Sequence, residues 1–275
     1  MSYTYNATLN FVGCPVSVQL NHPSLTEVLH KTYSALEVAQ RPSNLHYVVS
    51  LDSGTGIMSL EQQGGSCYQT RELGELVFLL EKEATISIQS LRRDLYFVHS
   101  AALEHLGKGI MIVAASGTGK STTAWALLKH GFHYLSDELA PIDISDMSIQ
   151  PYPHAICLKA RPPKDYPLPA DILSTSSTLH VPAYTFAESV CHQPVTLSAI
   201  FFLDYQPGLS NPTVTPISSA ETSARLYANT LNQLAHEDDG LAAAVAIARH
   251  VPGYSLVSAD LGKTCQLLNE VVVKL

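Results

Sequence analysis

The sequence predicts an α/β fold in which a small β-rich region precedes a larger domain. Two observations lead to this prediction. Apolar and polar residues alternate through much of the first ~65 residues, with the period of half-buried strands. Beyond them, short apolar runs alternate with stretches whose apolar residues recur at helical spacing. We therefore expect a β-rich N-terminal region over residues 1–70 and an α/β domain over residues 71–275.

In the N-terminal part, "YTYNATLNF" (from Tyr3) alternates as a strand does, and "LHYVVSLDSGTGIMSLEQQ" (from Leu45) predicts two strands around a glycine-rich turn. A helix is expected next, over "ELGELVFLLEKEATISIQSL". Its apolar residues fall at helical spacing, at Leu73, Leu76, Val77, Leu80 and Ala84.

Two apolar segments follow, "LYFVHSAALEH" (from Leu95) and "GIMIVAA" (from Gly109). The short link "LGKG" between them predicts an antiparallel hairpin. A helix is expected from Lys120, ending near Gly131, because glycine commonly terminates helices. "FHYLSDELAPID" then predicts a short strand that ends in two carboxylates, Asp137 and Glu138.

The C-terminal half begins with a proline-rich stretch from Pro151 to Tyr184, which predicts irregular loops with short strands and suits a cover or a rest for a substrate. "VTLSAIFFLDYQ" is typical of a buried strand. "SSAETSARLYANTLNQLA" predicts a helix with a capping box from Ser218 to Glu221. An alanine-rich helix over 241–249, a strand "YSLV" and a helix from about Asp260 complete the expected elements.

Composition excludes several classes of protein. Hydrophobic residues make up 46% of the chain and charged residues 15%, as in a folded globular protein. The net charge of −8 disfavours a broad nucleic-acid-binding surface. The five cysteines are scattered and form no CxxC pair, which indicates reduced thiols rather than disulfides or a zinc site. With no apolar run long enough for a membrane span and no signal-peptide pattern at the start, we expect a cytoplasmic protein.

The tetrapeptide SGTG occurs twice, and its flanking residues separate the two copies. The first, from Ser53, lies between two alternating runs and predicts a hairpin turn. The second, from Ser116, follows a buried strand and precedes Lys-Ser and a helix, which is the layout of a phosphate-binding loop. Its expected nucleotide-binding residues are Ser116, Gly117, Thr118, Gly119, Lys120, Ser121 and Thr122.

Within this loop, Lys120 is expected to hold phosphate and Ser121 to bind magnesium. We also expect Lys120 to face solvent and to support little packing. The full pattern GxxxxGK[ST] fails, because Ala114 stands at its first glycine. A carboxylate for the metal could come from Asp137 and Glu138, or from Asp204 at the end of "SAIFFLD".

The segment "FVHSAALEHLGKGIMIVAASGTGKSTTAWALLKHGFHYLSDELAPI" resembles the core of the HPr kinase/phosphorylase family and its HPr-kinase-related relatives. In that family a histidine-bearing strand leads by a hairpin into the phosphate loop, and the next strand ends in two acids. Weaker likeness in "PYPHAICLKA", "LSAIFFLDYQPG" and "AIARHVPGYSLVSADL" extends the resemblance over roughly residues 90–270. It implies a P-loop kinase core shared with phosphoenolpyruvate carboxykinase, a mixed sheet flanked by helices.

The resemblance also implies site residues. His99 falls on the family's active-site histidine, Lys120 and Ser121 on its loop residues, and Lys159 on a lysine that contacts phosphate or substrate. Asp137 and Glu138 fall on an Asp-Asp pair that binds metal and accepts the proton of the acceptor hydroxyl. Which of the two does which is left open. His154, where relatives often carry arginine, departs from the family pattern.

The expected function is therefore an ATP- and Mg²⁺-dependent phosphotransferase that phosphorylates a hydroxyl, most simply a serine of a peptide or protein. A small-molecule hydroxyl and an oligomeric state are left open, and no nucleic-acid or membrane partner is expected. HPr itself is not the expected acceptor, since the family's Gly-Arg-Asn-type substrate loop has no match here. One alternative is a nucleotide-binding regulatory module without phosphotransfer, which Ala114 and Glu138 would favour. The other is a P-loop NTPase that uses Asp204.

Overall fold

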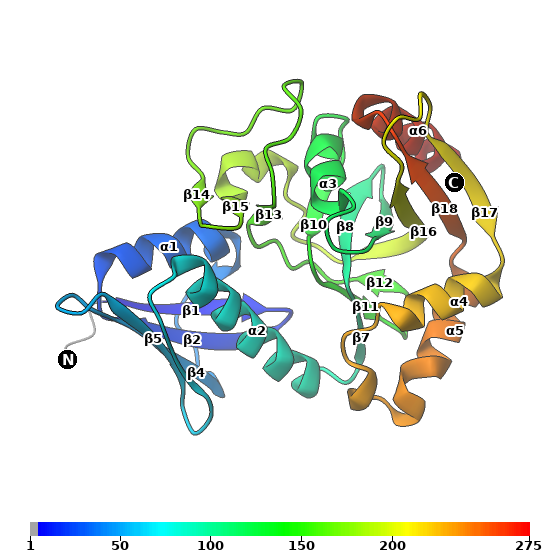
Figure 1. Ribbon diagram of the computed structural model, residues 1–275. Coiled ribbons are helices and arrows are strands. Elements are labelled where there is room, and N and C mark those ends of the chain that lie inside the picture. Colours follow the sequence, from blue (N-terminus) through cyan, green and yellow to red (C-terminus); the bar gives the residue numbers. More distant parts are fainter. Residues whose placement is uncertain (1–4) are drawn as a thin grey trace.

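The computed structural model describes residues 5–275 and has a mixed α/β architecture built on three sheets (Figure 1). A six-stranded sheet lies at the N-terminal end, a curled nine-stranded sheet forms the centre of the larger part, and a three-stranded sheet lies between them. Within the described residues, none of the helices has the length and apolar character that crossing a bilayer requires.

The N-terminal sheet has the strand order β3-β1-β2-β4-β5-β6. Strands β2 and β4 are parallel because helix α1 connects them, and the other neighbours are antiparallel. The predicted hairpin at the first SGTG is confirmed as β4 and β5, and the Asp52 carboxylate accepts the N–H of Gly54 in its turn. The elements are β1 (Tyr5–Phe11), β2 (Cys14–Leu20), α1 (Pro23–Tyr33), β3 (Glu37–Val38), β4 (Leu45–Asp52), β5 (Ile57–Gln62) and β6 (Cys67–Thr70).

The strand predicted from Tyr3 is observed from Tyr5, and residues 3 and 4 of that prediction lie outside the described residues. Strand β2 and helix α1 were not predicted. Helix α1 begins at a proline, a common first residue of helices, and buries Leu25, Leu29 and Tyr33 at helical spacing, so the sequence did carry a signal for it.

Helix α2 (Leu73–Leu91) covers one face of the N-terminal sheet (Figure 1). The predicted apolar stripe is buried at Leu76, Leu80 and Ala84, and these side chains share a hydrophobic core with strands β1, β2 and β4. This core lies on both sides of residue 70 and also takes in Leu95, Phe97, Leu139 and Tyr152 from the larger part. The division at residue 70 stays a proposal.

The central sheet has the order β10-β8-β9-β16-β12-β11-β7, with β18 paired to β16 and β17 to β18. Strands β9, β16 and β18 are parallel, and the remaining pairs are antiparallel. The strands are β7 (Leu95–Val98), β8 (Ser100–His105), β9 (Lys108–Val113), β10 (His133–Ser136), β11 (Ala140–Asp143), β12 (Ser148–Ile149), β16 (Val195–Tyr205), β17 (Thr213–Ile217) and β18 (Gly253–Ser258).

Helices cover both faces of this sheet, because successive side chains along its strands point to opposite faces and build a hydrophobic core on each. One core joins β8, β9 and β16 to helices α3 (Lys120–Leu128) and α6 (Leu261–Lys274). The other joins the opposite face to α4 (Ser219–Ala228) and α5 (Leu241–His250). The proline-rich stretch contributes the three-stranded sheet, formed by β13 (Ile156–Leu158), β14 (Leu173–Ser174) and β15 (Leu179–Val181). Short 3₁₀ segments lie at Ser34–Leu36, Ala183–Ser189, Gln233–Ala235 and Glu237–Gly240.

Two predicted elements have different bounds in the structure. The predicted strand over "LYFVHSAALEH" breaks at His99, since β7 pairs with β11 whereas β8 pairs with β9 and β10. The helix predicted from Ser218 ends at Ala228, and only half of its capping box forms. The Ser218 hydroxyl accepts the N–H of Glu221, but the Glu221 carboxylate pairs with Arg225 instead of reaching back.

Candidate active site

The second SGTG lies between strand β9 and helix α3, as the sequence predicts. Gly117 and Gly119 have φ angles of 87° and 96°, a left-handed conformation that residues with a Cβ rarely adopt. A Cβ at either glycine would point into open space, which leaves room above the loop for a ligand. No side chain among residues 5–275 caps α3, so its first backbone N–H groups are free to bind an anion.

Lys120 is the first residue of α3 and is buried, with 5% of its surface exposed. Its Nζ donates a hydrogen bond to Oδ1 of Asp137 at 3.2 Å and lies 3.7 Å from Oε2 of Glu138. The expectation that this lysine faces solvent is wrong. Two carboxylates beside the ammonium group offset the cost of removing it from water, so the chain can bury it.

The acidic pair follows strand β10, at an irregular place in the sheet. The pairing of β10 with β8 shifts register between Tyr134 and Ser136, and such bulges redirect the side chains that follow. Asp137 is completely buried, whereas the Glu138 side chain is 40% exposed. Glu138 also has a φ of 80°, which is a strained conformation for a residue with a side chain.

Two histidines hold the backbone of this pair. His99 Nδ1–H donates to the carbonyl oxygen of Glu138 at 3.1 Å, and His154 Nε2–H donates to that of Asp137 at 2.7 Å. A carbonyl oxygen can only accept, so each contact fixes which nitrogen carries the proton. His154, which is completely buried, thus holds the backbone of Asp137 in place.

Burial, and then the positive charge of Lys120, lowers the pKa of His99, and the carboxylate of Glu138 only partly opposes this. The His99 ring is therefore neutral near pH 7. With Nδ1 protonated and donating to Glu138, its Nε2 carries a lone pair. His99 lines the same pocket of about 150 Å³ as Lys120, Ser121 and Glu138.

Lys159 reaches this pocket from the residue after β13. Its Nζ donates to the hydroxyl of Ser116 at 2.6 Å, which places a second, exposed ammonium group at the phosphate loop. Thr118 closes the loop through its hydroxyl, which donates to the carbonyl oxygen of Ala115 at 2.7 Å. Of the residues predicted for nucleotide binding, all but Thr118 line the pocket: Ser116, Gly117, Gly119, Lys120, Ser121 and Thr122.

Asp204 does not join this group. It lies on β16, which is next to β9, but its exposed carboxylate accepts a hydrogen bond from Gln206 at 2.7 Å. The pocket that contains Lys120 and Ser121 is lined by Glu138 and not by Asp204.

Asp137 has a spare ligand oxygen for a cation. Its Oδ2 is buried and finds no hydrogen-bond partner in the part of the chain that the structure describes. A buried carboxylate oxygen without a partner is costly, and a bound cation is one way to satisfy it.

Within residues 5–275 no three acidic, histidine or cysteine side chains form a metal site by themselves. Mg²⁺ needs no such cage, because it commonly takes one or two carboxylates together with substrate phosphates. Ser121 and Glu138 line the phosphate-loop pocket, whereas Asp137 is buried and does not line it. Hydroxyl and carboxylate oxygens are ligands that Mg²⁺ takes, so the residues present fit a magnesium ion.

Sequence reasoning missed Glu81, a third carboxylate that comes from helix α2. Its Oε1 lies 3.6 Å from His154 Nε2, and its pKa is raised by burial and by the nearby carboxylates of Glu138 and Asp137. Nothing in the sequence links a glutamate in "LLEKEA" to an acidic pair more than 50 residues later (138 − 81 = 57). Only the packing of α2 against the larger part of the molecule brings them together.

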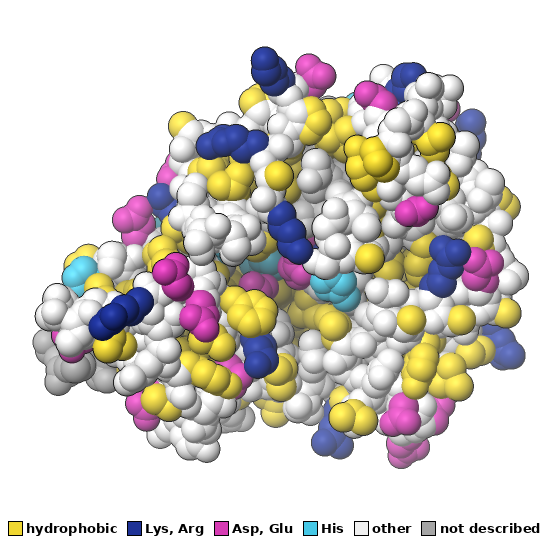
Figure 2. All heavy atoms as spheres, viewed as in Figure 1, with side chains coloured by type: hydrophobic (Ala, Val, Ile, Leu, Met, Phe, Trp, Pro, Cys, Tyr) yellow, Lys and Arg dark blue, Asp and Glu magenta, His cyan; other side chains and the backbone are white. Residues whose placement is uncertain are grey.

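The site borders a cavity between helix α2 and the larger part of the molecule. In Figure 2, acidic, histidine and hydrophobic side chains gather near the middle of the face shown. Glu138 and Cys157 line both the phosphate-loop pocket and a larger cavity beside it.

Comparison with known proteins finds a structural likeness but no sequence relative. No family model matches the chain, and no curated protein is similar to it in sequence. Among solved structures, the Hpr(Ser) kinase/phosphatase from Coxiella burnetii is 13% identical, with the match covering 65% of this chain and 88% of that one at a TM-score of 0.34. A likeness at this level adds nothing to what the site's geometry supports.

Proposed function

We propose that this protein is an ATP- and Mg²⁺-dependent phosphotransferase of the HPr-kinase-like type, which transfers the γ-phosphoryl group to the hydroxyl of a serine in a peptide or protein. One observation carries the proposal. The phosphate loop and the acidic pair meet at Lys120, whose ammonium group lies 3.2 Å from Asp137 and 3.7 Å from Glu138. Phosphoryl transfer needs these same parts: positive charge at the phosphates and a carboxylate beside the nucleophile.

The two acids differ in ways that suggest a division of labour. Asp137 is buried, bonded to Lys120 and left with one unpartnered oxygen, which suits a metal ligand. Glu138 is half-exposed and faces both the phosphate-loop pocket and the cavity beside it. We assign Glu138 to accept the proton of the acceptor hydroxyl. Because Glu138 lines the same pocket as Ser121, we also assign it to help hold the metal ion.

In the proposed reaction, the acceptor oxygen forms a bond to the γ-phosphorus while the bond from that phosphorus to the β–γ bridging oxygen breaks. The hydroxyl proton passes to Glu138, and ADP leaves with the bridging oxygen. The loop N–H groups, Lys120 and Lys159 hold the phosphates. His99, hydrogen-bonded to the Glu138 carbonyl, keeps the strained backbone of the base in place.

Magnesium, held by Ser121, Asp137 and Glu138, would neutralise charge on the β- and γ-phosphate oxygens. The protein's own groups already account for the rest of the site. Lys120 supplies a fixed positive charge in a buried setting, where electrostatic interactions are stronger than in water.

The test is the fate of the γ-phosphoryl group. The protein is incubated with Mg²⁺ and γ-³²P-ATP, with and without a library of serine-containing peptides, and the label in peptides and in free phosphate is measured. We expect slow hydrolysis without peptides and labelled peptides when they are present. Rapid release of free phosphate without any labelled peptide would favour a P-loop NTPase. Binding of ATP with neither product would favour a regulatory module.

A further inference from the structure

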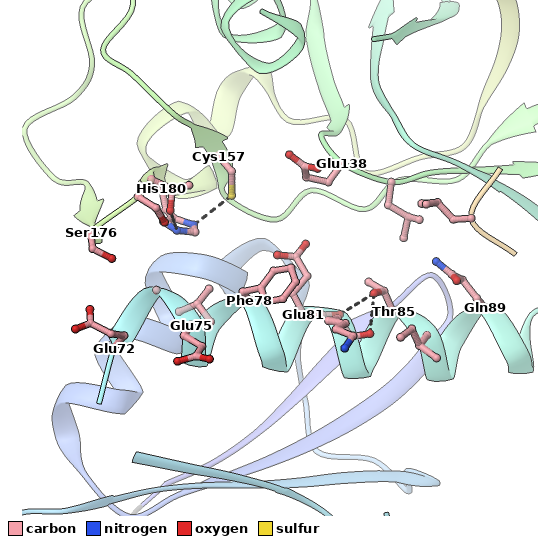
Figure 3. A pocket seen from close by; sticks show the side chains of 18 residues that line it. Glu72, Glu75, Phe78, Glu81, Thr85, Gln89, Glu138, Cys157, Ser176 and His180 are labelled. Carbon is pink, nitrogen blue, oxygen red and sulfur yellow. Dashed lines mark hydrogen bonds between the residues drawn. The ribbon is translucent and has the colours of Figure 1, made fainter. Parts of the chain in front are cut away.

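A large cavity opens beside the phosphate loop. Its volume is about 770 Å³, within the range of sites that enclose organic ligands. Helix α2 forms one wall, and Glu138, Cys157 and His180 lie on the wall that faces it (Figure 3). We call this cavity the α2 cleft; Glu72 and Gln89 mark its two ends along the helix.

The α2 cleft is continuous with the proposed phosphotransfer site. Glu138 and Cys157 line both the cleft and the smaller pocket that contains Lys120 and Ser121. A hydroxyl bound in the cleft beside Glu138 therefore lies at the entrance to the phosphate loop. This position fits the acceptor rather than the nucleotide, because the loop's glycines face the smaller pocket.

The length of the cleft fits an extended chain. Residues 72 to 89 of α2 span about 25 Å at 1.5 Å per residue, which matches roughly seven residues of an extended peptide. In Figure 3 Glu138 lies across from the Glu81–Thr85 stretch, away from both ends. A peptide in the cleft would thus present a central residue to Glu138 and continue on both sides.

The α2 wall offers apolar surface that the fold does not use. Phe78 and Ile86 are 62% and 49% exposed, although the opposite stripe of the same helix is buried. Leu231, 43% exposed, also lines the cleft and adds to this surface. Large apolar side chains gathered in one hollow are typical of a binding surface.

The charges of the cleft select the kind of ligand. Four carboxylates line it, from Glu72, Glu75, Glu81 and Glu138, against the single ammonium group of Lys82. His180 also lines the cleft, but its ring is neutral near pH 7, since burial lowers its pKa to about 4. An excess of negative charge disfavours acidic or already phosphorylated ligands and favours basic ones.

We propose that the α2 cleft binds the acceptor as an extended peptide segment with a serine opposite Glu138, a large apolar residue against Phe78 and Ile86, and a lysine or arginine near Glu72 and Glu75. The identity of the transferred group rests on the function proposed above. The binding of the peptide does not, so the two can be tested separately.

The probe is a positional library of fluorescein-labelled nine-residue peptides, made in two forms with serine or alanine at the centre. Binding is measured by fluorescence anisotropy with the full-length protein and a non-hydrolysable ATP analogue. We expect selection for a basic residue on one side of the centre and for a large apolar residue. We expect the alanine series to show the same preferences, because binding does not need the hydroxyl.

Three variants test the cleft, two single and one double. Phe78→Ala and Ile86→Ala should each raise the peptide Kd by about tenfold, since burying a large side chain contributes of this order. Glu72→Lys and Glu75→Lys together should turn the preference from basic to acidic residues. The matched controls are Leu91→Ala, an exposed apolar residue at the end of the same helix, and Glu61→Lys, an exposed acid on β5; neither lines the cleft. Circular dichroism checks that each variant is folded.

The outcomes separate the two proposals. Peptide binding that the cleft variants weaken and the controls do not supports the cleft, whether or not the serine series becomes labelled. If those peptides bind but take no label from γ-³²P-ATP, the proposed function is wrong and the cleft stands. An unchanged peptide Kd in Phe78→Ala and Ile86→Ala together with an unchanged charge preference in the double variant overturns the cleft. So does the absence of any peptide that binds more tightly than the unselected library.

Discussion

Replacing Lys120 by methionine tests the electrostatic centre of the site. The Lys120 ammonium and the Asp137 carboxylate are 6% and 0% exposed, with Nζ and Oδ1 3.2 Å apart. At an effective dielectric constant of about 20, their attraction is about 5 kcal/mol. Removing one partner of such a buried pair leaves the other unpaired, which costs about 3–5 kcal/mol of the free energy of unfolding. For a chain of this length the midpoint of thermal unfolding should fall by roughly 5–9 °C.

The assay is urea unfolding followed by circular dichroism, on Lys120→Met, on the double variant Lys120→Met/Asp137→Asn and on Lys159→Met. The double variant should recover most of the loss, because no buried charge is left unpaired. Lys159→Met should stay within about 0.5 kcal/mol of wild type, since Lys159 is exposed. A Lys120→Met protein as stable as wild type, or a double variant no better than the single one, would refute the reasoning.

Three further predictions concern the acids, the loop and pH. Asp137→Asn should lower the rate of phosphotransfer by roughly a hundredfold or more, and Asp204→Asn should be mild; the reverse order in a γ-³²P-ATP assay would reassign the metal ligand. Ala114→Gly should leave the Mg-ATP Kd within about twofold by calorimetry, because Ala114 is not among the described residues with positive φ; a tenfold tighter Kd would show that alanine distorts the loop. Burial lowers the pKa of His180 from 6.5 to about 4, so the unfolded state binds its proton first as pH falls. The free energy of unfolding should therefore drop between pH 6.5 and pH 4 by up to about 3 kcal/mol more in wild type than in His180→Asn, and equal pH dependence would contradict this.

The elements with strong periodic signals could be predicted from the sequence. The β4–β5 hairpin, helix α2 and strand β16 are found where alternation, helical spacing and a continuous apolar run indicate them. The break at His99 could not be predicted, because it depends on β7 pairing with β11 while β8 pairs with β9 and β10. Strand β2, which pairs with its neighbour β1, and helix α1 carry local patterns that were not recognised.

The site was predictable where its residues are close in sequence. The phosphate loop follows β9 and Asp137 follows β10, the next strand along the chain. Local sequence pattern and the family resemblance were therefore enough to predict that they belong to one site. The burial of Lys120 beside Asp137 and the support from His154 depend on tertiary packing within the larger part of the molecule, and the approach of Glu81 depends on the packing of α2 against it. Spacing along the chain carries no record of such contacts.

The most direct test of the account is a crystal structure of the protein with Mg²⁺ and a non-hydrolysable ATP analogue. We predict the metal on Ser121 and Asp137, the terminal phosphate between Lys120 and Lys159, and the Glu138 carboxylate facing that phosphate from the side of the α2 cleft. A metal bound by Asp204, or a nucleotide whose phosphates lie away from Lys120, would contradict the account.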